Sequence, residues 1–193
     1  MKLHSLLHSY DMLPVTMLKE FAWCPVIPWI VYNYGVEPPY TPSMVAGIEV
    51  QRSLNLEKIA DELKLPRPIE TSVYVEDRKL GLYGVIDIVA GSKRVCIVEV
   101  KAFRRRVRYS QHFILQLKAY AVIAYRTLRP VERAYLYMDG IAHSIAIREQ
   151  VFVEVRQVVE KLWRTVLSPE PPQVMRVQEK CNYCRYRRVC PLP

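Results

Sequence analysis

Two carboxylates and a lysine interrupt apolar segments of the chain that have the composition of strands. Asp87 lies within residues 85–89, and Glu99 and Lys101 lie within residues 96–101. Side chains two apart on a strand share a face, so Glu99 and Lys101 are predicted to point the same way. If Asp87 meets Glu99 across a hairpin, two hard oxygen ligands converge beside an ammonium group. This arrangement suits Mg²⁺ or Mn²⁺, which would activate a water and polarise a phosphoryl oxygen.

The same three residues have a simpler interpretation, in which Asp87 caps a strand and Glu99 and Lys101 form a solvated ion pair. The helix that follows favours the catalytic interpretation. Gln116 and Tyr120 are four residues apart, so they share a helix face and can reach both the metal site and a phosphate backbone. Taken alone, they would be boundary residues between the core and the surface.

A basic loop separates the second strand from this helix. Such a run is often a solvated turn. Next to a centre that cleaves phosphodiesters, it is instead expected to clamp a DNA backbone without reading its sequence. The basic residues of the loop are Arg104, Arg105, Arg106 and Arg108.

Three cysteines form a C-x2-C-x5-C cluster near the C-terminus, namely Cys181, Cys184 and Cys190. A fourth ligand is needed, and Cys24 is preferred to His143 because Cys24 precedes a proline, as Cys190 does. Four thiolates from both ends of the chain suit an iron–sulfur cluster, with zinc as the alternative. The fifth cysteine, Cys96, alternates with apolar residues and is predicted to be a small buried apolar side chain.

Composition limits the class of protein. The chain has 193 residues, 51% of them hydrophobic, which excludes disordered and fibrous architectures. Its net charge of +9 favours a polyanionic partner, nucleic acid before membrane. The apolar stretch from Phe21 is interrupted by prolines and is too short to span a bilayer. The N-terminal residues lack the apolar core of a signal peptide, so a soluble, cytoplasmic protein is expected.

The elements that position these residues follow from hydrophobic periodicity. A helix is predicted over residues 43–65 with Ser43 as its N-cap, then three strands within 71–103, the second and third forming a hairpin. A helix over 110–126, two strands around an Asp139-Gly140 turn and a helix over 151–167 complete an α/β fold with a mixed central sheet. The expected organisation is an N-terminal helical segment (1–70), a core (71–168) and a cysteine tail (169–193).

Together the motifs resemble those of the RecB-like nucleases that carry an iron–sulfur cluster. Within that family the chain is most similar to the stand-alone CRISPR-associated exonucleases, over residues 16–191. The motifs that carry the resemblance are Gly84-Val85-Ile86-Asp87, Glu99-Val100-Lys101 and Gln116-x3-Tyr120, framed by the four cysteines.

The resemblance implies a restriction-endonuclease-like PD-(D/E)xK core. It also implies a metal-dependent DNA exonuclease that acts on single strands in the 5′ to 3′ direction. Such an enzyme would serve antiviral defence by trimming DNA ends for CRISPR spacer acquisition, alongside the integrase proteins of that system.

The resemblance also assigns roles to residues. Asp87, Glu99 and the Val100 carbonyl would bind the metal, Lys101 would assist the attacking water, and Gln116 and Tyr120 would orient the substrate. The cluster would have four irons, although a two-iron form also fits four thiolates. Its ligands would be Cys24, Cys181, Cys184 and Cys190.

One position departs from the family. Relatives have G-x3-H in the helix after the first proline linker, and the histidine binds metal, whereas Gln51 follows Gly47 here. A glutamine oxygen is a weaker ligand, and Glu49 would face elsewhere on the helix. One alternative is therefore a non-catalytic DNA-end-binding or adaptor module of the same fold. A separate hypothesis, from the cysteines, is a zinc-stapled DNA-binding regulator. His4 and His8 are expected at the surface.

Overall fold

The computed structural model describes residues 12–38, 40–101, 111–138, 140–175 and 177–192. A six-stranded mixed sheet forms its centre, with the strand order β1-β3-β4-β5-β6 and β2 paired with β3. The strands are β1 (Leu13–Pro14), β2 (Ile69–Asp77), β3 (Leu82–Ala90), β4 (Val95–Lys101), β5 (Val131–Met138) and β6 (Ile141–Ala146).

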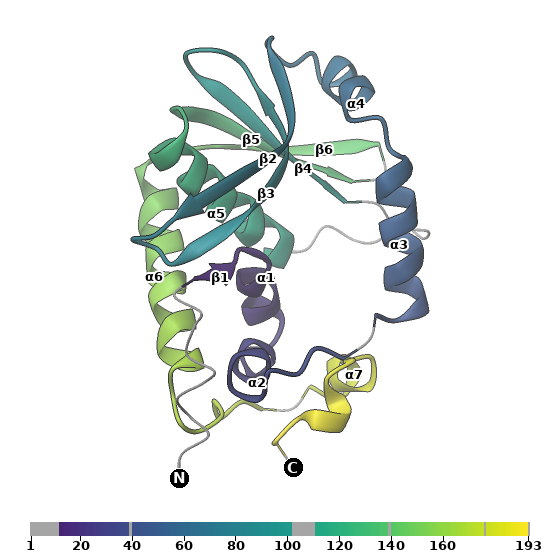
Figure 1. Ribbon diagram of the computed structural model, residues 1–193, viewed down its shortest axis with the longest axis vertical. Coiled ribbons are helices and arrows are strands. Elements are labelled where there is room, and N and C mark those ends of the chain that lie inside the picture. The colour runs from purple at the N-terminus through teal and green to yellow at the C-terminus, as the bar shows by residue number, and fades with distance from the viewer. Residues whose placement is uncertain (1–11, 39, 102–110, 139, 176, 193) are drawn as a thin grey trace.

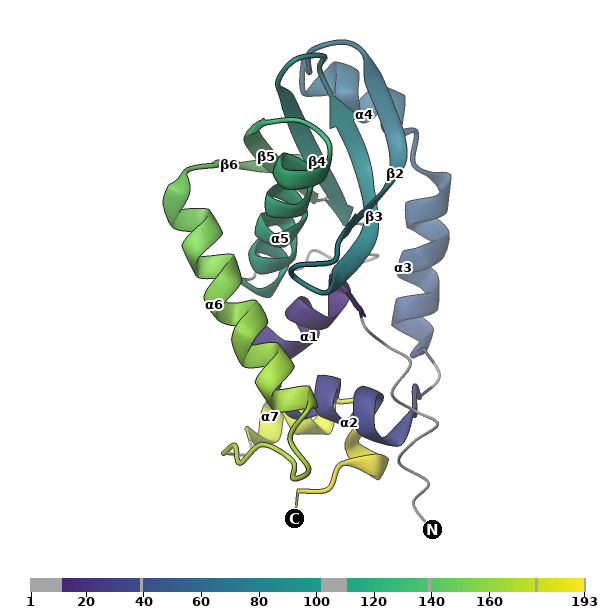
Figure 2. The same ribbon diagram turned by 60° about the vertical axis from the view of Figure 1, so that its left-hand side comes forward.

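Helices lie on both sides of the sheet (Figures 1 and 2). The long helices α5 and α6 lie on one side and α3 and α4 on the other, while α1, α2 and α7 gather beyond one end of the sheet. None of the helices in the described part of the chain is long and apolar enough to cross a membrane. Their bounds are α1 (Thr16–Trp23), α2 (Val26–Tyr34), α3 (Pro42–Ser53), α4 (Leu56–Glu62), α5 (Gln111–Thr127), α6 (Glu149–Val166) and α7 (Gln178–Asn182).

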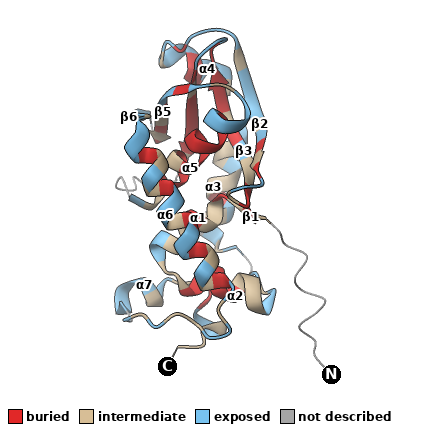
Figure 3. Ribbon diagram, turned by 90° about the vertical axis from the view of Figure 1, so that its left-hand side faces the viewer, coloured by how far each residue is buried: buried red, intermediate tan, exposed pale blue. Residues whose placement is uncertain are grey.

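The alternating side chains of β4 contribute to two hydrophobic cores, one on each face of the sheet. Val95 and Ile97 pack into the larger core with α5, whereas Val98 and Val100 pack into a smaller core with α4. Successive side chains of a strand point to opposite faces, so Glu99 belongs to the α5 side. Buried residues accordingly follow the central strands and α5 in Figure 3.

The elements predicted for residues 71–167 are confirmed, including the β3–β4 hairpin and the long helix α5. The prediction of a single helix over residues 43–65 is wrong, because two helices, α3 and α4, cover this range and are separated at Leu54 and Asn55. The Asn55 side chain accepts a hydrogen bond from the Lys58 N–H at 3.0 Å and so begins a new helix. The N-cap of α3 is Thr41 rather than Ser43, with Pro42 in the first turn.

Cys96 also differs from expectation, since its side chain is only half-buried. It packs at the margin of the smaller core, where the short helix α4 covers only part of the sheet.

Candidate active site

An open stretch on one edge of β3 creates the site. β2 pairs with β3 from Leu82 to Ala90. On the opposite edge, β1 pairs only at Leu82 and Tyr83, and β4 pairs only from Ile88 to Ala90. The strands β3 and β4 therefore separate before they reach Asp87 and Glu99, and the edge between these two pairings is free for side chains.

Asp87 bridges the separated strands. Its Oδ2 accepts a hydrogen bond from the Val100 N–H at 2.7 Å, so a carboxylate replaces the backbone partner that a continuous hairpin would supply. Opposite Asp87 on β2, Ser72 has a φ of 55°, and it is absent from the otherwise continuous β2–β3 register. The sheet is thus irregular on both sides of Asp87.

Glu99 and Lys101 form a buried ion pair. Lys101 Nζ lies 2.6 Å from Glu99 Oε1, and their side chains are 16% and 4% exposed. Their expected location on one face is confirmed, and the alternative of a solvated ion pair is excluded. The Lys101 ammonium also lies 5.8 Å from the centre of the Phe113 ring, a cation–π contact that the sequence did not predict.

The two oxygens of Glu99 have different environments. Oε1 accepts hydrogen bonds from Lys101 and, at 2.8 Å, from Gln116 Nε2. Oε2 is buried and has no hydrogen-bond partner among the described residues, and the same holds for Gln116 Oε1. Leaving such a group unsatisfied costs about 1–3 kcal/mol, and a bound cation would remove that cost.

Burial, and to a lesser extent the nearby Glu99 carboxylate, raise the pKa of Asp87 to about 7. The Val100 N–H and Lys101 oppose this effect. Two carboxylates that share a poorly solvated site repel each other unless a proton or a cation lies between them. The electrostatics of the site therefore favour a divalent cation.

Gln116 and Tyr120 extend the network back to β3. The Tyr120 hydroxyl interacts with Gln116 and with the Val85 backbone, while burial raises the Tyr120 pKa. Gly84 makes room for the tyrosine, because a Cβ at this position would lie 2.7 Å from the Tyr120 ring. A continuous series of contacts thus links Glu99, through Gln116 and Tyr120, to the free edge of β3.

Gln51 reaches the site from α3. Its Nε2 donates a hydrogen bond to the Val100 carbonyl at 3.3 Å, so the two groups that the resemblance assigns to the metal meet each other. Glu49 is exposed, as expected for a residue that faces away from the site. The Gln51 amide would have to rotate to present its oxygen to a cation.

The four cysteines from both ends of the chain surround one cavity of about 120 Å³. Burial raises the pKa of the Cys24 thiol, and the nearby Cys190 and Cys181 raise this pKa as well. The pKa of Cys184 is likewise raised by burial and by the other three cysteines of the cavity. Backbone N–H groups of Val26 and Ile27 bond the Cys24 thiol. Cys96 takes no part, as expected.

No group of three or more His, Cys, Asp or Glu side chains is arranged to hold a metal within the described ranges. The thiols therefore share a cavity without the close spacing of a closed metal site. Their chemistry nonetheless fits a thiolate-bound centre, because four soft donors enclosed by apolar residues are the usual ligands of iron–sulfur clusters.

Some predicted residues cannot be placed. Arg104, Arg105, Arg106 and Arg108 lie outside the described residues, as do His4 and His8. His143, the rejected candidate ligand, lies on β6 and does not line the cysteine cavity.

The sequence profile described as the PD-(D/E)XK nuclease superfamily matches residues 33–191. The chain therefore belongs to the PD-(D/E)XK nuclease superfamily, and the prediction of a metal-dependent nuclease is confirmed. It is similar to the CRISPR-associated exonuclease Cas4 of Aeropyrum pernix, with 29% identity over 93% of this chain and 94% of the relative.

Solved structures share the fold. The crystal structure of SSO0001 is similar with a TM-score of 0.55 and 18% identity, covering 97% of this chain and 90% of that one. The alkaline exonuclease LHK-Exo of Laribacter hongkongensis has a TM-score of 0.57 and 10% identity, covering 81% of this chain and 88% of that one. These likenesses support the expected restriction-endonuclease-like core with its mixed sheet.

Proposed function

We propose that this protein is a metal-dependent DNA exonuclease that degrades single strands from the 5′ end and prepares DNA ends for CRISPR spacer acquisition. The unpartnered, buried Oε2 of Glu99 beside Asp87 is the observation that carries the nuclease proposal. The name of the Aeropyrum pernix relative supports the exonuclease activity and the CRISPR context.

Asp87, Glu99 and the Val100 carbonyl are the groups that would hold the metal, with Gln51 beside them. When bound, Mg²⁺ or Mn²⁺ would supply Lewis-acid polarisation of the scissile phosphate and a lower pKa for the attacking water. Both carboxylates must be ionised to bind the cation, and the Val100 N–H and Lys101 favour the ionised form of Asp87.

The surrounding side chains position and stabilise the reacting groups. Lys101 holds its charge 2.6 Å from Glu99 Oε1, where it can stabilise negative charge that develops on a phosphodiester at the carboxylates. Gln116 fixes the orientation of Glu99 through the same oxygen. The Tyr120 hydroxyl contacts both Gln116 and the Val85 backbone, so it connects Gln116 to the unpaired edge of β3.

Single-turnover cleavage of an end-labelled single-stranded oligonucleotide with Mn²⁺ tests this proposal. Asp87→Ala should lower the rate at least a hundredfold while DNA binding is retained. Asp61→Ala, which removes an exposed carboxylate on α4, should cleave like the wild type. Comparison of 5′ and 3′ labels gives the polarity. Wild-type rates for Asp87→Ala would disprove the site assignment.

The Gln51 contact favours a second candidate function, a DNA-end-binding or adaptor module that has lost catalysis. In the structure, the Gln51 amide donates a hydrogen bond to the Val100 carbonyl, the group that would otherwise be a metal ligand. Tight binding of DNA ends by the wild type, without cleavage at any Mn²⁺ or Mg²⁺ concentration, would establish this alternative.

The proposal includes an iron–sulfur cluster held by Cys24, Cys181, Cys184 and Cys190, with four irons preferred to two. The shared cavity and the N–H groups around Cys24 support it. Integrase proteins of the CRISPR system are the proposed partners. A brown colour after anaerobic purification would distinguish iron from zinc.

A further inference from the structure

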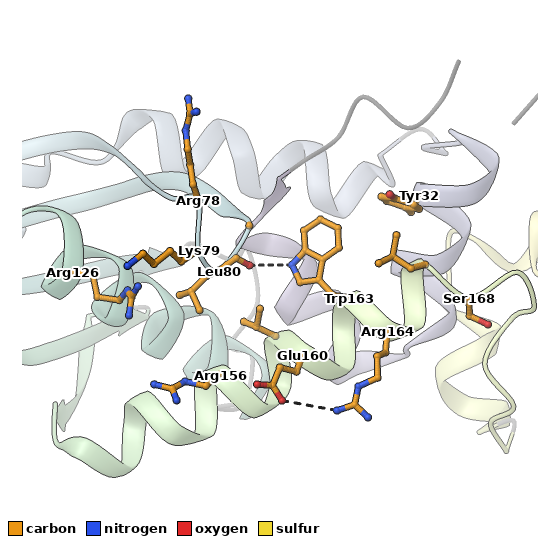
Figure 4. Close-up of a pocket in the computed structure, with 13 residues that line it drawn as sticks. Tyr32, Arg78, Lys79, Leu80, Arg126, Arg156, Glu160, Trp163, Arg164 and Ser168 are labelled. Carbon is orange, nitrogen blue, oxygen red and sulfur yellow. Dashed lines mark hydrogen bonds and ion pairs between the residues drawn. The ribbon is translucent and has the colours of Figure 1, made fainter. Parts of the chain in front are cut away.

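A wide groove of about 1,070 Å³ lies between the β2–β3 turn and α6, away from the carboxylates. Its cationic side chains come from three elements, as Figure 4 shows: the β2–β3 turn, α5 and α6. None of the residues of the candidate active site lines it. The basic residues are Arg78, Lys79, Arg126, Arg156 and Arg164.

Glu160 is the one acidic residue among the described groove-lining residues. Arg126 is neutralised by the buried Asp77, with which it forms an ion pair. Arg164 lies 3.9 Å from Glu160, and both side chains are highly exposed, so this pair is weak and easily exchanged for another anion.

Two further cations have no acidic partner in the described part of the chain. Lys79 and Arg156 are exposed and form no ion pair with any residue in the described ranges. Among the residues that the structure describes, Arg78 pairs only with Glu76, at 3.5 Å and with its own side chain 86% exposed. The groove therefore keeps a positive potential, which indicates a partner with repeated negative charges.

Two aromatic rings also line the groove. Trp163 and Tyr32 line the groove and are half-buried, with ring centres 6.3 Å apart and nearly perpendicular planes. The Trp163 indole donates a hydrogen bond to the Leu80 carbonyl at 3.0 Å, which fixes the ring against the turn. Proteins that bind single strands combine a basic groove with aromatic surfaces of this kind.

The groove is connected to the active site by continuous elements. Arg126 and Gln116 are both on α5, and ten residues of helix span about 15 Å. At 3.4 Å per nucleotide, the spacing along one strand of a duplex, this separation corresponds to roughly four nucleotides, and an extended single strand needs fewer. A strand with its end at the carboxylates can therefore reach the groove.

We propose that this groove binds the phosphodiester backbone of single-stranded DNA, as a second contact on the strand whose end lies in the nuclease site. Lys79 and Arg156 contact phosphates, and Trp163 with Tyr32 supports the bases. This inference rests on the proposed nuclease function and adds a holding site that keeps the strand attached while its end is cut.

Fluorescence anisotropy with labelled single strands in EDTA, over a range of salt concentrations, tests the groove without cleavage. The test variant is Lys79→Ala/Arg156→Ala. The matched control is Lys93→Ala/Lys161→Ala, which removes two exposed lysines, one in the β3–β4 turn and one on α6 itself, that do not line the groove. Both variants lose the same net charge.

The groove variant should bind a strand of about 25 nucleotides roughly three- to tenfold more weakly than the control, with a salt slope lower by about 1.4. A strand of about two nucleotides, too short to reach the groove, should bind both variants equally. Equal binding of the long strand by both variants would overturn the groove alone. If the wild type binds no single strand, the groove and the proposed function fail together.

Discussion

Gln51 is the residue that we expect to stand in place of a metal-binding histidine, and its contact indicates what a histidine would change. The Gln51 amide donates to the Val100 carbonyl, so it competes with a cation for that oxygen. Neutral imidazole is the commonest side-chain ligand of protein-bound metals, so a histidine at position 51 would add a ligand that the hydrogen-bonded amide does not supply.

Gln51→His is therefore expected to lower the Mn²⁺ concentration for half-maximal cleavage by roughly tenfold. The measurement is the cleavage rate against Mn²⁺ concentration. Glu49→His places the same side chain on an exposed position of α3 and should leave the wild-type value unchanged. An unchanged value for Gln51→His would show that residue 51 does not act on the metal.

Gly84 is a second residue whose role follows from a single contact. Gly84 has no Cβ, and this makes room for the Tyr120 ring. A Cβ at this position would lie 2.7 Å from Tyr120 Cε1. Gly84→Ala should displace Tyr120, lower the free energy of unfolding by about 1–3 kcal/mol and slow cleavage.

Chemical denaturation measures this effect, and a double-mutant cycle with Tyr120→Ala isolates it. With the ring removed, the added methyl group has nothing to displace, so Gly84→Ala should have little further effect. An equal destabilisation in both backgrounds would mean that the contact with Tyr120 is not its cause.

At this scale the sequence predicted much of the candidate site. Strand alternation placed Glu99 and Lys101 on one face, and helical spacing placed Gln116 beside Tyr120. The division of Glu99 into a bonded and an unpartnered oxygen was not predictable, because it depends on side-chain positions in three dimensions. The same is true of the Phe113 ring near the Lys101 ammonium.

At the scale of elements, α5 connects the two regions of interest. Gln116 and Phe113 contact the carboxylate site, whereas His112 packs edge-on against Trp23, with ring centres 5.6 Å apart. Trp23 directly precedes Cys24, and Lys180 from α7 lies 4.9 Å from its ring centre. The N-terminal turn of α5 thus joins the nuclease core to the cysteine region.

This contact predicts a pH-dependent stability. Burial lowers the pKa of His112 from 6.5 to about 4, with Lys19, Lys180 and Lys101 adding to the effect and Glu20 opposing it. A depressed histidine pKa stabilises the fold above the unfolded value of 6.5, and the stabilisation is lost as the pH falls toward 4. The full shift corresponds to about 3 kcal/mol, and solvent screening of this half-buried group reduces it to about 1–2 kcal/mol.

His112→Phe keeps the ring contact with Trp23 but removes the titration. Its free energy of unfolding should therefore fall less than that of the wild type between pH 7 and 4, by about 1–2 kcal/mol. Denaturant unfolding at several pH values measures this difference. Parallel pH profiles of the two proteins would exclude His112 as the titrating group.

The elements themselves were largely predictable, and the two main failures have different causes. Periodicity continues through Leu54, so only the capping preference of Asn55 could have indicated the break between α3 and α4. The open edge of β3 was not visible either, because β1 is only two residues long and lies far from β3 in the sequence.

At the scale of the whole molecule, the groove and the cysteine cavity are both assembled from distant segments. No local motif marks the groove, since its cations are scattered over a turn and two helices. The composition only predicted an anionic partner. The cysteine cavity was easier to anticipate, because cysteines are rare and the spacing of three of them is typical of metal ligands.

The cysteines also determine how the two ends of the chain hold together. Cys24 follows α1, and Cys181, Cys184 and Cys190 follow the last long helix, so a shared cluster would close a loop of most of the chain. Val26, Ile27, Trp29, Ile30 and Tyr186 form a small separate core around them. Because this core contains few apolar side chains to offset the entropy of ordering the tail, we expect a cross-link through the cysteines to contribute to its stability.

Cys184→Ser should therefore abolish the brown colour of the anaerobically purified protein and lower its melting temperature by roughly 5–15 °C, given the entropy of closing so long a loop. Cys96→Ser, which changes a half-buried cysteine outside the cavity, should keep the colour and most of the stability. Visible absorbance and thermal unfolding measure the two effects separately. A colourless Cys184→Ser protein with a wild-type melting temperature would show that the cluster does not hold the termini together.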